Sequence, residues 1–310
     1  MSEITGIVNI NKPAGLTSYQ VVAEVKKILS CKKAGHTGTL DPAAKGVLPV
    51  CLGKATKIIP FIPEEEKEYL ATITLGQTTD TLDAEGKILE ENEGWRQLGL
   101  RDIEMVLQKF IGDIEQIPPM YSAVHHEGIR LYQLAREGKE VERKPRQVQI
   151  KELELLDVEL PQFKIRVLCS PGTYIRTLAA DIGEELQVGA HLSELIRSKS
   201  GPFSINKAVS LEELRNTGRE NILPADYPLN YPMLYIKEEA LNFARNGVTL
   251  YRHNFREIPA ELRKDIKKDR LVSVYYEDIL ISISKIFFKD NNHFECKPLR
   301  VLNIERSIQK

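Results

Sequence analysis

The chain has 310 residues, of which 42% are hydrophobic and 28% are charged, and its formal net charge is −1. This length suits one large domain with a small one, and the composition is ordinary for a soluble globular protein. No apolar run reaches about 18 residues. The N-terminus has neither a basic flank nor a long apolar stretch, so we expect a cytoplasmic protein without a signal peptide or membrane helix.

The sequence lacks the fingerprints of several enzyme classes. The four cysteines form no CxxC pair, which argues against a zinc site or a disulfide framework, and we expect small buried residues at Cys31, Cys51, Cys169 and Cys296. There is no GxxxxGK[ST] phosphate loop, no GxGxxG dinucleotide fingerprint, no HExxH metal motif and no GxSxG nucleophile elbow. We therefore expect no metal and no cofactor.

The first elements lead into a loop rich in glycine. Residues 6–11 predict a short strand, and Thr17 with Gln20 predicts the capping box of a helix whose valines share one face. The sequence GHTGTLDPAAKG at residues 35–46 then predicts a loop that holds Asp41 among small residues. Small residues leave room for a substrate, and an ionised carboxylate can act as a nucleophile there. An ordinary Asp-Pro turn explains the same residues without any chemistry.

Two later segments supply further candidate site residues. Residues 69–75 alternate as a half-buried strand, which places Tyr69 on its apolar face. After another such strand, Thr173 is the expected N-cap of a helix with one buried face. Arg176 falls in the first turn of this helix, where a positive charge is unfavourable unless a carboxylate such as Asp41 pairs with it. The plain alternatives are a core tyrosine and a surface arginine.

Charge is segregated along the chain. Residues 125–151 contain seven lysines and arginines against four glutamates, and they overlap a polar excursion at residues 118–145. Acidic runs occur at residues 64–68 and between Asp83 and Glu93, and we interpret both as solvated surface. Because the whole chain is nearly neutral, any RNA-binding surface must be a local basic patch.

The last third of the chain has a different texture. Three prolines within residues 224–232 indicate a domain boundary. A short helix at residues 237–246 precedes strand-like segments, in one of which Ile279, Ile281 and Ile283 should share a face. We predict an α+β fold, with a mixed, mostly antiparallel sheet flanked by helices and a small β-rich domain after it.

Five ordered motifs resemble those of the TruB-type tRNA pseudouridine-55 synthases. They are NKPAGLTS (11–18), GHTGTLDPAAKGVLPVCLG (35–53), KEYLATITLGQTTDTLDAEG (67–86), IPPMYSAVHHEGIRLYQLAREG (117–138) and SPGTYIRTLAADIG (170–183). The similarity extends through most of residues 6–215, and the C-terminal region is similar, less sharply, to a PUA domain. The resemblance implies the pseudouridine synthase fold. It implies a catalytic domain at residues 1–230, with an RNA-binding insertion at 121–145, and a PUA-like RNA-binding domain at 235–310.

The resemblance also implies a reaction and a role for each site residue. A T-loop uridine of tRNA would be flipped out and isomerised to pseudouridine. We expect a monomer that needs no cofactor and no obligate protein partner. Asp41 would be the catalytic aspartate, paired with Arg176, and Tyr69 would pack on the flipped base and accept a proton. His36 would fill the space that the base leaves, and Lys12 belongs to a motif that braces the catalytic loop. RNA-binding side chains would include Lys12, His36, Arg130, Arg143, Lys144 and Arg146.

Other functions fit part of the pattern. A retaining glycosidase also uses an aspartate nucleophile, but it needs a second carboxylate about 5–5.5 Å away, and no other motif offers an obvious one. A non-catalytic RNA-binding protein would have no need of Asp41, Tyr69 and Arg176 together. The related RNA-guided synthases carry partner proteins and basic tails, and we expect the ending at residues 304–310 to be too short for such a tail.

Overall fold

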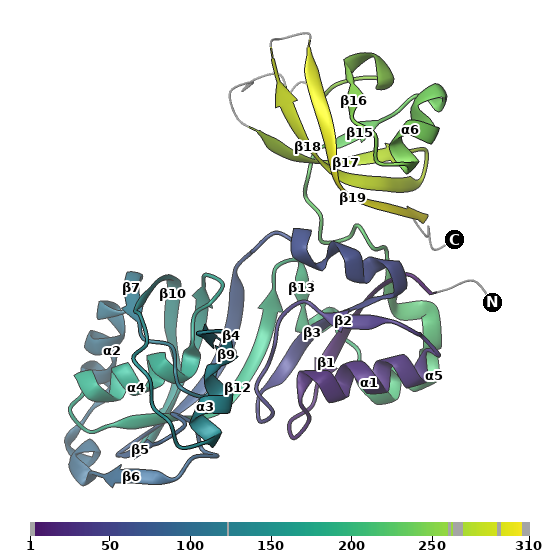
Figure 1. The fold of residues 1–310 in the computed structure, drawn as a ribbon. Coiled ribbons are helices and arrows are strands. Elements are labelled where there is room, and N and C mark those ends of the chain that lie inside the picture. The colour runs from purple at the N-terminus through teal and green to yellow at the C-terminus, as the bar shows by residue number, and fades with distance from the viewer. Residues whose placement is uncertain (1–3, 123, 260–261, 263–268, 290–292, 306–310) are drawn as a thin grey trace.

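The computed structural model describes residues 4–305, apart from residues 123, 260–261, 263–268 and 290–292. Within this range the chain forms a ten-stranded sheet and a five-stranded sheet, and in Figure 1 the smaller sheet stands above the larger one. Strands β5 (Gln77–Thr79) and β6 (Ile88–Glu91) form a separate hairpin, as do β8 (His125–His126) and β9 (Ile129–Arg130).

The large sheet is mixed and mostly antiparallel, as the sequence predicts. Only β12 and β3 run parallel among the strand pairs described in it. Its main strands, in spatial order, are β14 (Ile222–Leu223), β1 (Gly6–Lys12), β3 (Lys45–Leu52), β12 (Ala190–Ser200), β4 (Lys67–Leu75), β11 (Gln162–Cys169), β10 (Arg146–Glu159) and β7 (Gly112–Gln116). Two short strands extend it, β2 (Ala34–His36) beside β3 and β13 (Phe203–Ser204) beside β12.

Helices cover the two halves of this sheet separately, and each half has its own hydrophobic core. Helices α1 (Ser18–Ile28) and α5 (Leu211–Thr217) pack against each other beside β1, while α2 (Leu100–Lys109) and α4 (Ile175–Glu185) lie at the other end of the sheet, beside β10 and β12 (Figure 1). Shorter 3-10 helices connect the strands: η1 (Gly53–Phe61), η2 (Glu93–Gln97), η3 (Ile205–Lys207) and η4 (Gly218–Asn221). No described helix is long and apolar enough to cross a membrane.

Several local predictions are confirmed by the contacts. Thr17 and Gln20 form the reciprocal capping box at the start of α1, and the apolar face of β4 is buried from Tyr69 to Leu75 in the core beneath α4. The cysteines are buried and unpaired at Cys31, Cys51, Cys169 and Cys296. The burial of the apolar face of β4 fixes the register of this strand, and in this register the Tyr69 side chain points into the core.

Two sequence assignments near the predicted site are wrong in detail. The N-cap of α4 is Tyr174, because the Thr173 hydroxyl donates instead to the carbonyl of Ser170 at 2.8 Å. The loop predicted at residues 35–46 is shorter at both ends, since β2 extends to His36 and β3 starts at Lys45. Pairing with neighbouring strands supplies backbone hydrogen bonds that the local glycine content does not reveal.

The five-stranded sheet is built from the C-terminal segment. Its strands, in order, are β15 (Met233–Tyr235), β17 (Arg270–Tyr276), β18 (Ile279–Phe288), β19 (Phe294–Glu305) and β16 (Leu250–Tyr251), with η5 (Glu238–Ala240), α6 (Leu241–Arg245) and η6 (Arg252–Asn254) beside them. Ile279, Ile281 and Ile283 do not share a face, contrary to the prediction. The pairing of β18 is irregular after Leu280, so Ile283 and Leu280 pack on one side of the sheet and Ile281 on the other.

A shared apolar core joins the two sheets. It contains residues from β1, β3, η1 and β13, from the segment between β14 and β15, and from β17, β18 and β19: Ile7, Val47, Cys51, Ala55, Ile58, Phe203, Ala225, Leu229, Tyr275, Leu280, Ile283, Leu302 and Ile304. Within it, the Tyr275 hydroxyl donates to Asp226 Oδ2 at 2.8 Å. The small sheet therefore shares an apolar core with β3, the strand that leaves the Asp41 loop, and β19 contacts η1.

Candidate active site

A pocket of about 210 Å³ opens where the Asp41 loop, β4 and the start of α4 meet. Asp41, Tyr69 and Arg176 all line it, although they are far apart in the sequence. The rest of the lining consists of small, apolar and hydroxyl side chains with one further cation: Thr39, Leu40, Lys67, Ser122, Gly172, Thr173, Tyr174, Ile175 and Leu195. The structure thus brings the three predicted catalytic residues into one site.

Arg176 forms the centre of the polar contacts in this site. Its side chain is buried on the first turn of α4, and its Nε lies 3.0 Å from Asp41 Oδ2. Its two other nitrogens donate to the carbonyl of Thr81 at 3.1 Å and to the carbonyl of Tyr121 at 2.8 Å. A planar guanidinium with all its nitrogens engaged has one fixed orientation, so it holds Asp41 in place as well as neutralising it.

The Asp41 carboxylate is only partly covered. Its side chain keeps 42% of its surface exposed toward the pocket. Burial of the remainder raises the pKa of Asp41 above its usual value, and the Arg176 guanidinium opposes that rise by stabilising the charged form. The balance leaves an oriented acceptor that a bound substrate can reach.

A second carboxylate, Asp83, also approaches the same arginine. Its Oδ2 lies 3.6 Å from Arg176 Nη1, and its side chain is only 16% exposed. Its Oδ1 accepts hydrogen bonds from the Thr81 hydroxyl at 2.6 Å and from the backbone N–H of Glu85 at 3.1 Å. The interpretation of the Asp83 run as solvated surface is therefore wrong at Asp83 itself, because a tight turn folds this side chain inward.

Lys12, at the end of β1, supports the backbone of the Asp41 loop through hydrogen bonds. Its side chain has no exposed surface, and its ammonium group donates to the carbonyls of Pro13 and Pro42, both at 2.9 Å. Burial lowers the pKa of Lys12 to about 8. The Ser18 hydroxyl adds a reciprocal pair of bonds with the backbone of Leu40. In this conformation Lys12 braces the loop and presents no surface to RNA.

Tyr69 forms one wall of the pocket. Its side chain is 7% exposed, and burial raises the pKa of its hydroxyl, while the nearby guanidinium of Arg197 opposes the rise. Lys67 and Leu195 also line the pocket, and sequence reasoning assigned a role to neither. Lys67 lies in the motif that contains Tyr69, whereas Leu195 and Arg197 belong to none of the five motifs. Only the pairing of β12 with β4 brings them to the site.

None of the predicted RNA-binding residues is among the described residues that line this pocket, and they differ in exposure. His36 ends β2, and its buried Nδ1 has no hydrogen-bond partner among the described residues; burial lowers the pKa of its imidazole. Arg143 is largely buried and donates to the carbonyl of Pro118 at 3.2 Å. Lys144 and Arg146 are exposed. The backbone of Arg130 is in β9, but its side chain lies outside the described residues.

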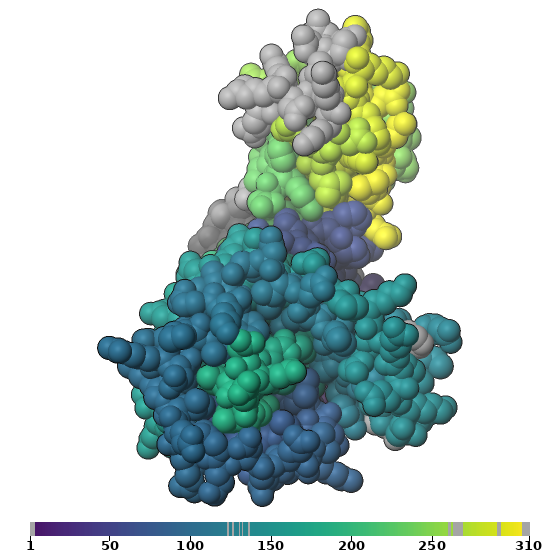
Figure 2. Space-filling model, turned by 90° about the vertical axis from the view of Figure 1, so that its left-hand side faces the viewer, coloured from purple at the N-terminus to yellow at the C-terminus, as the bar shows by residue number. Residues whose placement is uncertain are grey.

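The insertion at residues 121–145 folds into a short unit of its own. The β8–β9 hairpin runs directly into α3 (Leu131–Arg136), so the segment is not the plain polar loop that composition suggests. In Figure 2 it forms part of the teal lobe that stands out from the body of the molecule. Its first residues touch the site, since the Tyr121 carbonyl accepts from Arg176.

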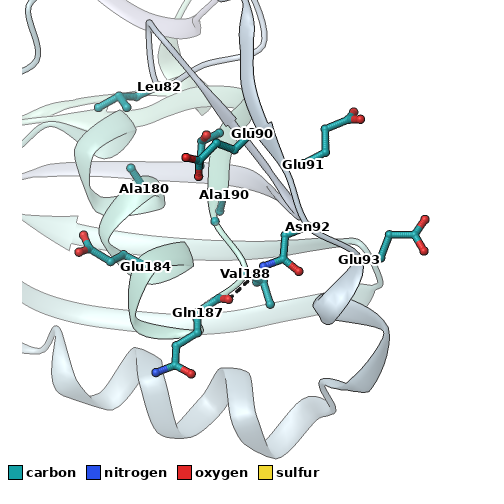
Figure 3. Close-up of a pocket in the computed structure, with 12 residues that line it drawn as sticks. Leu82, Glu90, Glu91, Asn92, Glu93, Ala180, Glu184, Gln187, Val188 and Ala190 are labelled. Atoms are coloured by element: carbon teal, nitrogen blue, oxygen red, sulfur yellow. Dashed lines mark hydrogen bonds between the residues drawn. The ribbon is translucent and has the colours of Figure 1, made fainter.

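A larger pocket, of about 890 Å³, lies beside the C-terminal half of α4 and has different chemistry. Figure 3 shows that carboxylates surround it, and its lining includes Glu90, Glu91, Glu93 and Glu184. The side-chain amide of Asn92 closes one wall by donating to the Gln187 carbonyl at 3.3 Å. Negative charge makes this surface unsuitable for an RNA backbone.

Comparison with known proteins identifies the family. A model of the N-terminal domain of TruB family pseudouridylate synthases matches residues 26–175, and a model of the C-terminal domain of tRNA pseudouridylate synthase B matches residues 176–230. The tRNA pseudouridine synthase B of Syntrophomonas wolfei is 48% identical over 296 residues, which cover 91% of this chain and 98% of that protein. The chain belongs to the TruB family. A second TruB relative, from Clostridium tetani, is 44% identical over 91% of this chain and 96% of its own length.

Solved structures share the TruB fold. A Cbf5–Nop10–Gar1 complex contains a chain with a TM-score of 0.72 and 30% identity, covering 96% of this chain and 84% of that one. An H/ACA RNP bound to a substrate RNA containing 2′-deoxyuridine contains another, with a TM-score of 0.71 and 27% identity, covering 97% and 86%. The similarity includes the C-terminal sheet of this protein, because each of the two structures covers nearly all of its chain.

Proposed function

We propose that the pocket around Asp41 isomerises the T-loop uridine of tRNA, uridine-55, to pseudouridine. The observation that carries this proposal is the contact of 3.0 Å between Asp41 and Arg176, in a pocket that also contains Tyr69. The names of the two TruB relatives, tRNA pseudouridine synthase B, support the substrate.

The reaction requires only a rearrangement of bonds. The glycosidic bond from the sugar to N1 breaks, a bond from the same sugar carbon to C5 forms, the C5 proton leaves and N1 is protonated. Asp41, in its ionised form, would act as the nucleophile toward the electrophilic sugar carbon. Tyr69 would pack on the base and accept a proton, and Arg176 would keep Asp41 ionised and oriented. No reagent is consumed, which agrees with a sequence that lacks cofactor fingerprints.

Access to the pocket requires that the uridine leave its stacked position in the RNA. Extrusion costs a few kcal/mol, and stacking on an aromatic side chain such as Tyr69 returns about 1–3 kcal/mol per base. Phosphate contacts of Lys144 in the insertion and of Arg146 just after it would offset the rest, because both side chains are exposed. His36 would occupy the space vacated in the loop.

We also propose the division of labour between the two parts of the chain. Residues 1–230 would form the catalytic domain, with residues 121–145 as its RNA-binding insertion, and residues 235–310 would form a PUA-like RNA-binding domain. The enzyme would work in the cytoplasm as a monomer without an obligate protein partner. Light scattering of the purified protein, alone and with tRNA, tests the oligomeric state: a dimer would contradict the proposed monomer.

The test uses purified protein, an unmodified T-arm stem-loop and no additives. Wild-type protein should form pseudouridine at one position, detected by chemical probing and by release of tritium from uridine labelled at C5. Asp41→Asn should bind the RNA but yield no product. Asp157→Asn, the same change at an exposed position, should behave as wild type. Product formation by Asp41→Asn at the wild-type rate would remove Asp41 from the mechanism.

The glycosidase alternative gains little from Asp83. That carboxylate accepts two hydrogen bonds, lies beside the Arg176 guanidinium and does not line the pocket, so it is not placed to donate a proton to a bound substrate. The assay separates the two functions, because a glycosidase would release free uracil and leave an abasic site. A non-catalytic RNA-binding protein would give neither product.

A further inference from the structure

Arg197 is a buried cation at the base of the pocket with no assigned role. It lies in β12 and is 1% exposed, among the largest of the fully buried side chains. Its Nε donates to the carbonyl of Val47 at 2.8 Å, its Nη1 to that of Thr39 at 3.2 Å and its Nη2 to that of Gly38 at 3.1 Å. These three acceptors are uncharged. A fully buried arginine is usually paired with a carboxylate, because burial removes the water that stabilises its charge.

The three carbonyls lie on both sides of Asp41. Gly38 and Thr39 precede it in the chain, and Val47 follows it in β3. One rigid, planar group therefore ties together the two ends of the segment that presents the carboxylate. A lysine could not do this, because its single nitrogen cannot reach acceptors spread around a planar fork.

The same residue also fixes the distance from this segment to Tyr69. The backbone of Arg197 pairs with Gly46 on one side and with Tyr69 on the other, so β12 joins β3 to β4. The charge of Arg197 reaches the site as well: it opposes the burial-driven rise in the pKa of Tyr69. Arg197 thus acts on both proposed catalytic groups from a position behind them.

The support from Arg197 complements that from Lys12. Lys12 contacts the carbonyl of Pro42, one residue after Asp41, whereas Arg197 holds the more distant ends of the loop. Neither residue lines the pocket, so neither is expected to touch the substrate. Loop closure of this kind costs backbone entropy once, at folding, and not during each turnover.

We propose that Arg197 is a positioning residue of this enzyme, which sets the geometry between Asp41 and Tyr69 by clamping residues 38–47. The inference rests on the proposed function, since it concerns the rate of that reaction. Its signature is a loss of kcat without a matching loss of RNA affinity, because Arg197 is only 1% exposed and presents no surface to RNA.

The experiment compares Arg197→Met, Arg197→Lys and Leu214→Ala. Methionine fills much of the same volume without charge or donors, and lysine keeps the charge but supplies one donor nitrogen. Leu214 is fully buried in the separate core beneath α1 and α5, so its truncation supplies a variant that is destabilised without a change at the loop. Each variant is measured for melting temperature, RNA affinity, kcat and KM on the T-arm stem-loop.

The expected results are specific. Arg197→Met should lower kcat about 100-fold, the penalty typical of a misplacement of about 1 Å, with RNA affinity within about threefold of wild type. Arg197→Lys should recover about tenfold of that loss, because it restores the charge and part of the clamp. Leu214→Ala should keep kcat, measured below its melting temperature.

The outcomes separate this inference from the proposed function. Wild-type protein that forms no pseudouridine would overturn the proposed function, whatever Arg197 does. With active wild type, wild-type kcat in Arg197→Met, or a loss of kcat no larger than in Leu214→Ala at the same drop in melting temperature, overturns the positioning role. If Arg197→Met does not fold, Arg197→Lys decides alone: kcat equal to wild type contradicts the clamp, and a loss at unchanged RNA affinity supports it.

Discussion

Gly46 offers a quantitative test of how tightly the Asp41 loop is packed against β12. Its φ is +105°, a conformation that side chains other than glycine rarely adopt, and a Cβ atom at this position would collide with the carbonyl oxygen of Arg197. Gly46→Ala therefore combines two penalties: about 1–2 kcal/mol for the left-handed backbone and about 1–3 kcal/mol for overpacking against a backbone that cannot move freely. The expected loss of unfolding free energy is roughly 2–5 kcal/mol.

Gly112→Ala is the matched control for this measurement. Gly112 has nearly the same φ, +109°, but an added Cβ would meet nothing within 4 Å. This variant should lose only the backbone part, about 1–2 kcal/mol. Urea unfolding of both variants and the wild type, with kcat on the T-arm stem-loop, gives the comparison. Equal destabilisation of the two variants, with kcat unchanged in Gly46→Ala, would refute the packing argument.

Three further outcomes follow from the contacts. Arg176→Lys should lower kcat by roughly 100-fold, with the melting temperature reduced by the lost bonds to two carbonyls; wild-type kcat would contradict the role of the guanidinium. The rate of the chemical step should fall as the pH decreases through the pKa of Asp41, because protonation removes the ionised form that the proposed reaction needs. Burial raises this pKa above the ordinary value of about 3.9. A rate that stays constant down to pH about 4 would contradict this expectation. Tyr275→Phe should cost about 1–3 kcal/mol in urea unfolding, since Asp226 loses a buried donor; an unchanged midpoint would show that the bond adds nothing.

Local sequence patterns predict those elements that show either a regular hydrophobic repeat or a contact between residues close together in the chain. The alternation from Tyr69 to Leu75 predicted a buried face, and the capping residues predicted the start of α1. The charge argument at the first turn of α4 predicted a carboxylate beside Arg176, and Asp41 lies there. The first two inferences depend on interactions within a few residues of the chain, whereas the third uses a local signal, a positive charge in the first turn of a helix, that calls for a partner distant in the sequence.

The remaining site residues depend on tertiary contacts with no local signal. Asp83 sits in an acidic run that reads as surface, and only the turn after β5 directs it toward Arg176. Arg197 is one basic residue among several in its segment, and only the strand order β3–β12–β4 places it behind the pocket. The irregular pairing after Leu280 likewise reverses an alternation that the sequence alone suggests.

The apolar contact between the two sheets has a consequence for how the protein unfolds and how it can be altered. Val47 and Cys51, in the strand that leaves the Asp41 loop, share their packing with Ile283 and Leu302 of the C-terminal sheet. The two parts should therefore melt in a single cooperative transition. A chimaera that exchanges the C-terminal module for another must reproduce this apolar surface, because Val47 and Cys51 otherwise lose the part of their core to which Ile283 and Leu302 belong.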